Sequence, residues 1–354
     1  GGSPSGSGGS GTGGSSGTGG APSGGGGSDT GGSSGTTGGS PSGGGGSGTG
    51  GSSGTGGSPS SGGTGNFANC VPPYSPDSPW NTPIGDSPSY HGSSWSMVDQ
   101  IAEPLGSSPD QWTMSVYRVD SSTPEKRITV SGVYSDVYWT GGGEQISVSN
   151  DWNRDGDLEL WIPIPDGAEP ADPTFSQDSW TDAQLVIWDQ ETGDEWGFWR
   201  VQRNGSSYEA DGFGSRGAGV PYLTGLIFPC ELEQGHIDHA IAFAYDSPDD
   251  TYVYPATKSD GHGGGSDLPQ GARLQLDPSL SESTIRGWGC TGSCLTIARA
   301  LQTYGMIVID HCGSSKLYPQ WSGSVDWHGL LDRDTPEPIP LEGFHVLDFG
   351  QRLQ

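Results

Sequence analysis

The densest group of titratable side chains in this sequence lies between Glu231 and His239. Three carboxylates and two imidazoles occur within these nine residues, which lead into an apolar run that ends at Tyr245. Carboxyls and imidazoles whose pKa is shifted by burial are the usual groups of general acid–base catalysis. We therefore predict Asp238 and His239 as acid–base residues, with a buried pair that only binds loop backbone as the alternative. A transition-metal site at His236, Asp238 and His239 is disfavoured, because adjacent residues of a strand point to opposite faces.

Two further carboxylates lie beside aromatic or strand-forming residues. Glu195 directly precedes Trp196 and lies close to Trp199, and Asp310 ends a short apolar run. Aromatic rings stack on the C–H faces of sugars, and glycoside hydrolysis uses two carboxyl groups about 5–10 Å apart. The pattern predicts Glu195 and Asp310 as further catalytic residues and Trp196 and Trp199 as sugar platforms. Each acid taken alone is also compatible with a solvated loop charge.

A polysaccharide lyase would need a different set of groups. A base must remove a proton next to a uronate carboxylate, and a cation must neutralise that carboxylate. His239, Tyr254, Lys258 and Arg273 are candidates, of which Tyr254 and Arg273 are predicted to bind substrate. The chain has 14 Lys and Arg against 42 Asp and Glu, and this net charge of −28 disfavours a polyanionic substrate unless a local basic cleft overrides it. The same charge excludes nucleic acid as an expected partner.

An acidic segment resembles the first half of a calcium-binding loop. Asp151, Asn153, Asp155 and Asp157 alternate around Gly156, which matches the oxygen ligands and the turn residue of such loops. The second half does not match, because Ile162 stands where a bidentate Glu is expected. The segment predicts either a structural Ca²⁺ site or an ordinary acidic β-turn, and no other cofactor is expected.

The elements that must position these residues are mostly strands. Short runs rich in β-branched and aromatic residues alternate with Gly, Pro, Asp and Ser, which is typical of an all-β fold. The predicted strands are 112–119, 127–130, 137–140, 145–148, 158–164, 184–188, 196–202, 225–230, 237–245, 272–276, 306–310 and 344–347. Helices are expected at 294–304, with Ser293 as N-cap and Gly305 as the stop, and more weakly at 96–105. We predict a two-sheet, jelly-roll-like sandwich with one or two decorating helices.

The small residues of the run 237–245 form a second pattern. Ala240, Ala242 and Ala244 share one face of the expected strand. A face of small side chains allows another layer or a ligand to approach closely.

The first 66 residues differ from the rest of the chain. They contain 33 Gly, and their only charged residue is Asp29. Such a composition cannot bury enough apolar surface to offset the loss of chain entropy. We predict a disordered Gly/Ser/Thr-rich tether at 1–66 and one β-rich globular domain at 67–354. Similar leaders follow the lipid-anchored cysteine of some exported lipoproteins, so a lipid anchor upstream of residue 1 is an open alternative.

Five cysteines suggest an oxidising compartment. Because the number is odd, at most two disulfides can form within the chain, and Cys290 and Cys294 are the expected local pair. No apolar run is long enough to span a membrane. We therefore expect a monomer that is secreted or tethered to the outer cell surface, its signal peptide already removed.

Six short phrases of the domain look familiar when taken together. They are SPWNTPI (78–84), WIPIP (161–165), EWGFW (195–199), GHIDHA (235–240), GARL (271–274) and YGMIV (304–308). They resemble a group of exported, mostly β-sandwich proteins of actinobacteria and myxobacteria to which no activity is commonly assigned. The resemblance spans most of 66–354 and draws attention to the polar residues inside these phrases. Asn81 is on this ground predicted to bind substrate.

These observations predict an enzyme that degrades an extracellular polysaccharide, with glycoside hydrolysis by paired carboxylates as the first expectation. A non-catalytic carbohydrate-binding module and a polysaccharide lyase are the alternatives, and a purely structural surface protein is a third. The sequence holds no nucleophile elbow, phosphate-binding loop or zinc-protease motif that would favour another reaction.

Overall fold

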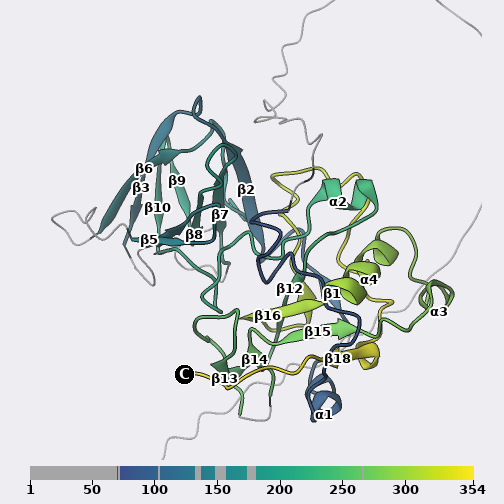
Figure 1. The fold of residues 1–354 in the computed structure, drawn as a ribbon. Helices are drawn as coiled ribbons and strands as arrows, with labels where there is room; N and C mark the ends of the chain where they lie inside the picture. The colour runs from purple at the N-terminus through teal and green to yellow at the C-terminus, as the bar shows by residue number, and fades with distance from the viewer. Residues whose placement is uncertain are drawn as a thin grey trace, which may run out of the picture. The chain divides into compact units, whose positions relative to one another are not determined.

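A computed structural model describes residues 70, 72–102, 104–131, 137–147, 157–173, 181–264 and 267–354. The chain divides into two units, Gly1–Ser58 and Pro59–Gln354, and every described residue belongs to the second. This unit is mostly β, with several mixed sheets and few helices, as predicted (Figure 1). The described residues hold four α-helices, which is more than expected: α1 (Ser94–Val98), α2 (Pro229–Gln234), α3 (Glu282–Gly287) and α4 (Ser293–Thr303).

Two sheets face each other as a sandwich. The first has the order β6 (Leu158–Pro163), β3 (Glu125–Val130), β10 (Ser207–Ala210), β9 (Gln202–Asn204). The second has the order β2 (Met114–Val119), β7 (Gln184–Asp189), β8 (Glu195–Trp199), β4 (Val137–Trp139), β5 (Gln145–Ser147), and β11 (Gly212–Phe213) also pairs with β8. Strand β6 shows why they associate: Leu158, Leu160 and Ile162 are buried, whereas the residues between them are more exposed. These side chains and those of the facing sheet form one apolar core.

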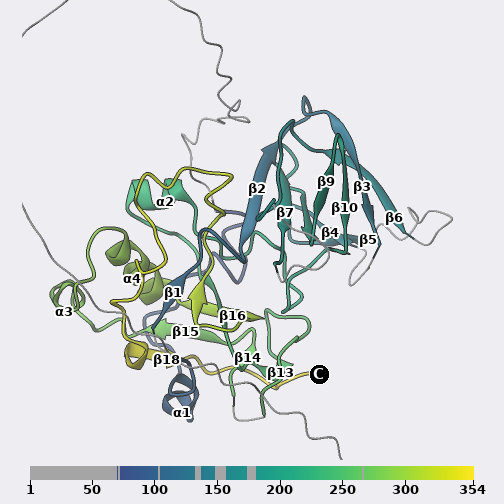
Figure 2. The same ribbon diagram turned by 180° about the vertical axis from the view of Figure 1, so that it is seen from behind.

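A third sheet is mixed in strand direction. Its order is β1 (Gly106–Ser107), β17 (Lys316–Leu317), β12 (Ile241–Tyr245), β16 (Met306–His311), β15 (Arg273–Leu276), β18 (Phe344–Val346). Strands β12 and β16 run parallel, so the chain between them must cross over, and α3 and α4 lie in that connection. The connection also contains the small pair β13 (Asp249–Tyr252) and β14 (Pro269–Gln270). Figure 2 shows α4 beside β15, the strand with which it makes its contacts.

The central strands β12 and β16 bury both of their faces. Phe243 and Val308 belong to the core that includes helix α4. Ala242, Ala244 and Ile309 belong to another core, which they share with the outer face of strands β2 and β7. The third sheet is therefore a middle layer between α4 and the sandwich.

The predicted small-residue face does admit a close layer. The backbone N–H of Ala242 donates to the carbonyl of Gly225 at 2.9 Å. A Cβ at Gly225 would lie 2.4 Å from the Ala242 nitrogen, and its φ of +66° is a left-handed value that favours glycine. The segment around Gly225 thus lies directly on the sheet.

Several predicted boundaries are wrong. The run 225–230 is not a strand, because Pro229 begins α2, where its missing N–H costs nothing. The strand expected from Ile237 begins at Ile241. Helix α4 has Gly292 as N-cap and Ser293 as its first residue, and the weak helix is only Ser94–Val98. The short strands β1, β9, β10, β11, β13, β14 and β17 and the helices α2 and α3 were not separately predicted.

Two disulfides are present. Cys290 pairs with Cys294, as predicted, and Cys70 pairs with Cys230 across 160 residues of sequence. Cys312 is the free cysteine. Among the described residues, no helix is both long and apolar enough to cross a membrane.

Candidate functional site

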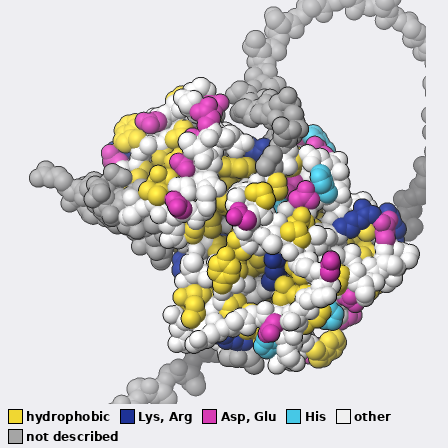
Figure 3. All heavy atoms as spheres, viewed as in Figure 1, with side chains coloured by type: hydrophobic (Ala, Val, Ile, Leu, Met, Phe, Trp, Pro, Cys, Tyr) yellow, Lys and Arg dark blue, Asp and Glu magenta, His cyan; other side chains and the backbone are white. Residues whose placement is uncertain are grey.

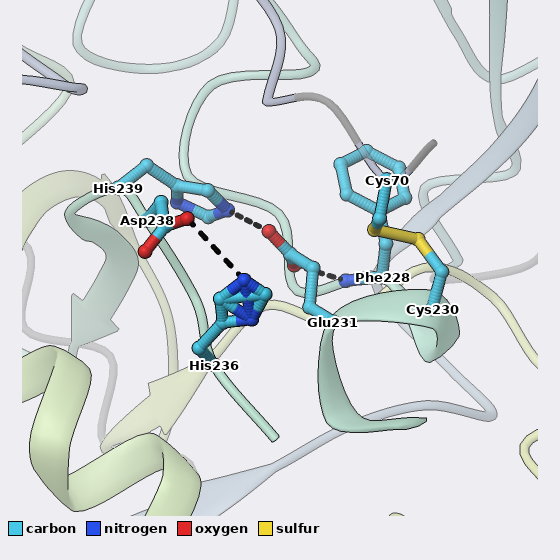
Figure 4. The surroundings of a disulfide bond; sticks show 7 residues. All are labelled: Cys70, Phe228, Cys230, Glu231, His236, Asp238 and His239. Atoms are coloured by element: carbon cyan, nitrogen blue, oxygen red, sulfur yellow. Dashed lines mark hydrogen bonds and ion pairs between the residues drawn. A yellow bond between two sulfur atoms is a disulfide. The ribbon is translucent and has the colours of Figure 1, made fainter. Parts of the chain in front are cut away.

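Asp238 and His239 lie in different environments (Figure 4). The side chain of Asp238 is 56% exposed, and its Oδ2 lies 3.6 Å from Nε2 of His236. His239 is buried, and its Nε2 lies 2.9 Å from Oε1 of Glu231. Its Nδ1 lies 2.9 Å from the carbonyl oxygen of Ala240. The structure therefore does not bring Asp238 and His239 together as an acid–base pair.

The His239–Glu231 pair ties local structure together. Burial by itself would lower the pKa of His239, but the charge of Glu231 and its hydrogen bond outweigh burial and raise it. Glu231 also accepts the backbone N–H of Phe228 at 2.8 Å, which caps α2 beside the Cys70–Cys230 disulfide. These contacts match the alternative in which the cluster binds loop backbone.

Glu195 is fully enclosed. It is 1% exposed, and it accepts the hydroxyl of Tyr74 at 2.5 Å and the backbone N–H of Leu223 at 3.0 Å. Burial raises the pKa of Glu195 to about 7, although these hydrogen bonds favour the ionised form. Because successive strand residues alternate, Gly197 and Trp199 lie on the same face of β8 as Glu195. A Cβ at Gly197 would lie 2.0 Å from the ring of Tyr222, so this ring packs directly against the strand.

Asn81 and Arg273 organise the segment that carries Tyr74. The Asn81 amide donates to the carbonyls of Pro73, Tyr74 and Ser75 at 2.8, 3.2 and 3.1 Å. Tyr74 has a φ of 73°, a left-handed value that costs energy for a residue with a side chain. The Asn81 contacts therefore hold a strained loop against Glu195.

Arg273 reaches the same segment from β15. Its guanidinium donates to the carbonyls of Tyr304 at 2.6 Å and Thr82 at 2.9 Å, and burial lowers its pKa to about 10. Tyr254, the other residue predicted to bind substrate, is 77% exposed on the surface. The geometry thus gives Arg273 a backbone-binding role.

A second group of charged residues surrounds Asp310 at the end of β16. We call it the Asp310 cluster, and its members are Asp182, Arg216, Asp260, Asp310, Lys316 and Tyr318. The side chain of Arg216 is 0% exposed, and its Cζ lies 4.0 Å from the centre of the Tyr318 ring. Its Nη2 is 3.6 Å from Oδ2 of Asp310. Its Nε, Nη1 and Nη2 have no hydrogen-bond partner among the described residues.

Two carboxyls of the cluster lie against each other. Burial, and then the charge of Asp260, raise the pKa of Asp310 to about 7, while Arg216 opposes this shift. A hydrogen bond between Asp310 and Asp260 also favours the protonated form. The carboxylate of Asp260 lies where a Cβ of Gly217 would be, at 2.3 Å, so glycine is required for this approach. The Asp310 side chain is only 18% exposed, whereas Asp260 is exposed and its carboxylate accepts the side-chain amide of Gln270, so solvent reaches this pair mainly at Asp260.

The remaining members lie on the other side of the cluster. Asp182 accepts the indole N–H of Trp199 at 3.0 Å. Burial raises the pKa of Asp182, this hydrogen bond opposes the shift, and the charge of Asp310 adds to it. Lys316 is 2% exposed and donates to the carbonyl of Trp112 at 2.9 Å. Its Nζ lies 4.7 Å from the centre of the Tyr318 ring. The ring of Tyr318 therefore contacts both buried cations.

Backbone hydrogen bonds bring these residues together from distant parts of the chain. The N–H of Ala218 donates to the carbonyl of Ile309, and the N–H of Thr257 donates to the carbonyl of Ala218, both at 2.9 Å. The glycine-rich segment 214–219 is thereby held between β16 and the loop that carries Asp260. The glycines of this segment were the one feature of the sequence that indicated a close approach of another part of the chain, here the loop that carries Asp260.

The structure places the predicted residues in three groups. Glu195, Trp199 and Asp310 lie in or beside the layer that holds the cluster, whereas Asp238 and Tyr254 are exposed elsewhere. Trp196 points to the sandwich side of β8, where its ring stacks on Tyr138 at 5.3 Å. The sequence did not reveal Arg216, Asp182, Asp260, Lys316 or Tyr318.

The predicted calcium segment is only partly described. Asp151, Asn153 and Asp155 lie outside the described residues, and Asp157 lines a hollow of about 250 Å³ with Glu209 and Asp211. In the part of the chain that the structure describes, no group of three or more His, Cys, Asp or Glu could hold a metal ion.

The Asp310 cluster is a filled polar site rather than an open cleft. Hollows of about 460, 360 and 250 Å³ have other linings, which include neither Asp310 nor its partners. A ligand would therefore enter at the exposed carboxyl pair. Figure 3 shows Asp and Glu side chains spread widely over one face of the molecule, with fewer Lys and Arg.

Comparisons with protein-family models, with curated proteins and with solved structures find no match. Any functional conclusion must therefore come from the geometry of the site.

Proposed function

We propose that this chain is an extracellular polysaccharide hydrolase whose acid–base chemistry takes place at the Asp310 cluster. The observation that carries the proposal is the solvent-accessible Asp310 carboxyl, whose pKa is raised to about 7 beside a second carboxyl. A carboxyl that keeps its proton near neutral pH can act as a general acid, provided that another carboxylate lies nearby.

The residues then take distinct roles. Asp310 donates its proton to the glycosidic oxygen, and the bond between this oxygen and the anomeric carbon breaks. Asp182 is the second carboxylate in this proposal. It either takes a proton from the water that attacks the anomeric carbon, or attacks that carbon itself to form a glycosyl ester that water then hydrolyses. Asp260 keeps the proton on Asp310, because its own charge raises the pKa of Asp310. Trp199, half-buried and bonded to Asp182, supplies a ring for a sugar to stack on.

The cluster fits hydrolysis better than elimination. Three residues predicted for a lyase lie outside the cluster: His239 is buried against Glu231, Arg273 binds backbone carbonyls and Tyr254 is exposed. Two disulfides are compatible with an oxidising, extracellular compartment. Placement outside the cell, with the first 66 residues as a tether, is part of the same proposal.

The test uses the full chain with neutral and acidic polysaccharides. New reducing ends are measured together with near-ultraviolet absorbance, because only elimination creates an absorbing unsaturated product. We expect reducing ends without absorbance, and a loss of about 10²–10⁴-fold in kcat for Asp310→Asn and for Asp182→Asn. Asp238→Asn is the matched control, since this exposed carboxyl should leave kcat unchanged.

Three results would reject the proposal. Full activity of Asp310→Asn would exclude the proposed acid. Absorbance rising with the reducing ends would show a lyase. Binding without turnover by the wild type would indicate a carbohydrate-binding module.

A further inference from the structure

The guanidinium of Arg216 lacks acceptors. It carries five N–H donors in a planar fork, and it is fully buried. Among the described residues none accepts a hydrogen bond from its Nε, Nη1 or Nη2, and the carboxyl oxygen of Asp310 at 3.6 Å is too far for one. Buried charged groups are nearly always hydrogen-bonded, because an unmade bond leaves their desolvation uncompensated. Arg216 therefore keeps unused hydrogen-bond donors, for which the described residues supply no acceptor.

A second buried cation lies at the same place. Lys316 contacts the ring of Tyr318, as does Arg216. Burial lowers the pKa of Lys316, and the charge of Arg216 lowers it further. The whole chain has 14 Lys and Arg against 42 acidic residues, yet two of these cations are buried on one ring. Two buried cations on one ring repel each other, so an anion close to both would stabilise them.

The carboxyls of the cluster only partly provide that anion. The raised pKa of Asp310 means that its carboxyl is largely protonated in mildly acidic solution. Asp182 accepts the indole N–H of Trp199, and among the described residues neither Arg216 nor Lys316 donates a hydrogen bond to it. Positive charge at Arg216 and Lys316 is thus incompletely balanced when Asp310 holds the proton that the reaction requires.

We propose that Arg216 and Lys316 form a subsite for an anionic group of the substrate, a carboxylate or a sulfate, so that the polysaccharide is an acidic one. The planar fork of arginine binds such groups through two parallel hydrogen bonds. The anion enters beside the partly exposed carboxyl of Asp310 and completes the hydrogen bonds of the guanidinium. This substrate class rests on the proposed function for turnover, but the binding itself does not.

The experiment measures binding by calorimetry in the Asp310→Asn background, so that ligand is not consumed. The probes are oligogalacturonate, oligomers of a sulfated galactan and neutral cello-oligosaccharides. We expect at least tenfold tighter binding of one anionic probe, and which one it is identifies the anion. Adding Arg216→Met should abolish this preference, whereas adding Arg127→Met, a change at an exposed arginine, should keep it.

The variant should fold, because its guanidinium makes no hydrogen bond that methionine would lose. If its Tm nevertheless falls steeply, Lys316→Met gives the same test from the second cation. Equal binding of anionic and neutral probes overturns the subsite, and so does a preference that survives both changes. If only neutral polysaccharides are hydrolysed, the anion subsite is rejected and the proposed hydrolase function stands. If anionic probes bind selectively but nothing is hydrolysed, the subsite stands and the hydrolase function is rejected.

Discussion

The buried carboxyl of Glu195 should make the stability of the protein depend on pH in a way that one substitution removes. Burial raises the pKa of Glu195 to about 7 from an ordinary 4.5. Folding therefore favours the protonated carboxyl. The stabilisation is complete below the unfolded-state pKa, and it is lost as the pH rises through the folded-state pKa. Glu195→Gln cannot ionise, so it should remove this part of the pH dependence.

The size of the effect follows from the shift. A difference of about 2.5 pKa units, at 1.36 kcal/mol for each, corresponds to about 3 kcal/mol of unfolding free energy between mildly acidic and mildly alkaline solution. No reduction for solvent screening is needed, since Glu195 is 1% exposed. The substitution also disturbs the hydrogen bonds from Tyr74 and Leu223, which costs roughly 1 kcal/mol at any pH.

The assay is urea denaturation of the wild type and of Glu195→Gln at about pH 5 and about pH 8. At each pH we compare the unfolding free energy of the variant with that of the wild type. From the lower to the higher pH, this comparison should shift in favour of the variant by about 2–3 kcal/mol. Glu125→Gln is the control, because this exposed carboxyl should show no such change. If Glu195→Gln loses the same stability at both pH values, the carboxyl is not held protonated by burial.

Three other outcomes are expected. Asp260→Asn removes a charge that raises the pKa of the proposed acid, so the alkaline limb of the pH–rate profile should move to lower pH by about one unit, and an unmoved limb would contradict the pairing. Glu231→Gln should lower the unfolding free energy by about 3 kcal/mol near pH 6, and by less as the pH rises and His239 loses its proton; denaturation across pH measures this, and a constant loss would count against the ion pair. Gly197→Ala forces a methyl group into the Tyr222 ring, so thermal unfolding should reveal a loss of about 1–3 kcal/mol or more, whereas an unchanged Tm would show that the ring moves freely.

The fold class was predictable because its cause is local. Apolar and polar residues alternate along strands such as β6, and the short spacing of turn residues limits the strands to a few residues each. Helix α2 was not predictable in the same way. Its first residues continue the apolar run 225–228, which has the composition of a strand, and only Pro229 and the Glu231 cap favour a helix.

The candidate site was predictable only in part, for a different physical reason. Glu195, Trp199 and Asp310 stand out because a polar residue at a strand end, or an aromatic residue beside an acid, is a local pattern. Arg216 and Asp182 carry no such pattern. Asp182 lies just before β7 and Arg216 just after β11, and tertiary contacts rather than sequence spacing place them near Asp310.

The close spacing of titratable residues in the sequence around Asp238 and His239 did not produce an acid–base pair. Both residues lie in the loop before β12, where Asp238 is exposed and His239 is buried against Glu231. A short segment with many titratable residues shows that several charges lie close along the chain, but not that their side chains contact one another. The buried imidazole of His239 pairs with Glu231 of α2, whereas the imidazole of His236 is exposed.

The small side chains of β12 connect the core to the site. Because Ala242 and Ala244 leave the sheet surface low, the segment around Gly225 lies directly on β12 and hydrogen-bonds to it. That segment follows Arg216 and Ala218 in the chain, and Ala218 is itself hydrogen-bonded to Ile309 near the end of β16. A larger residue at Ala242 would lift the segment, and Arg216 would move away from Asp310. The apolar layer thus supplies the packing energy that holds two buried cations and their carboxyls in place, which the charged groups alone would not provide.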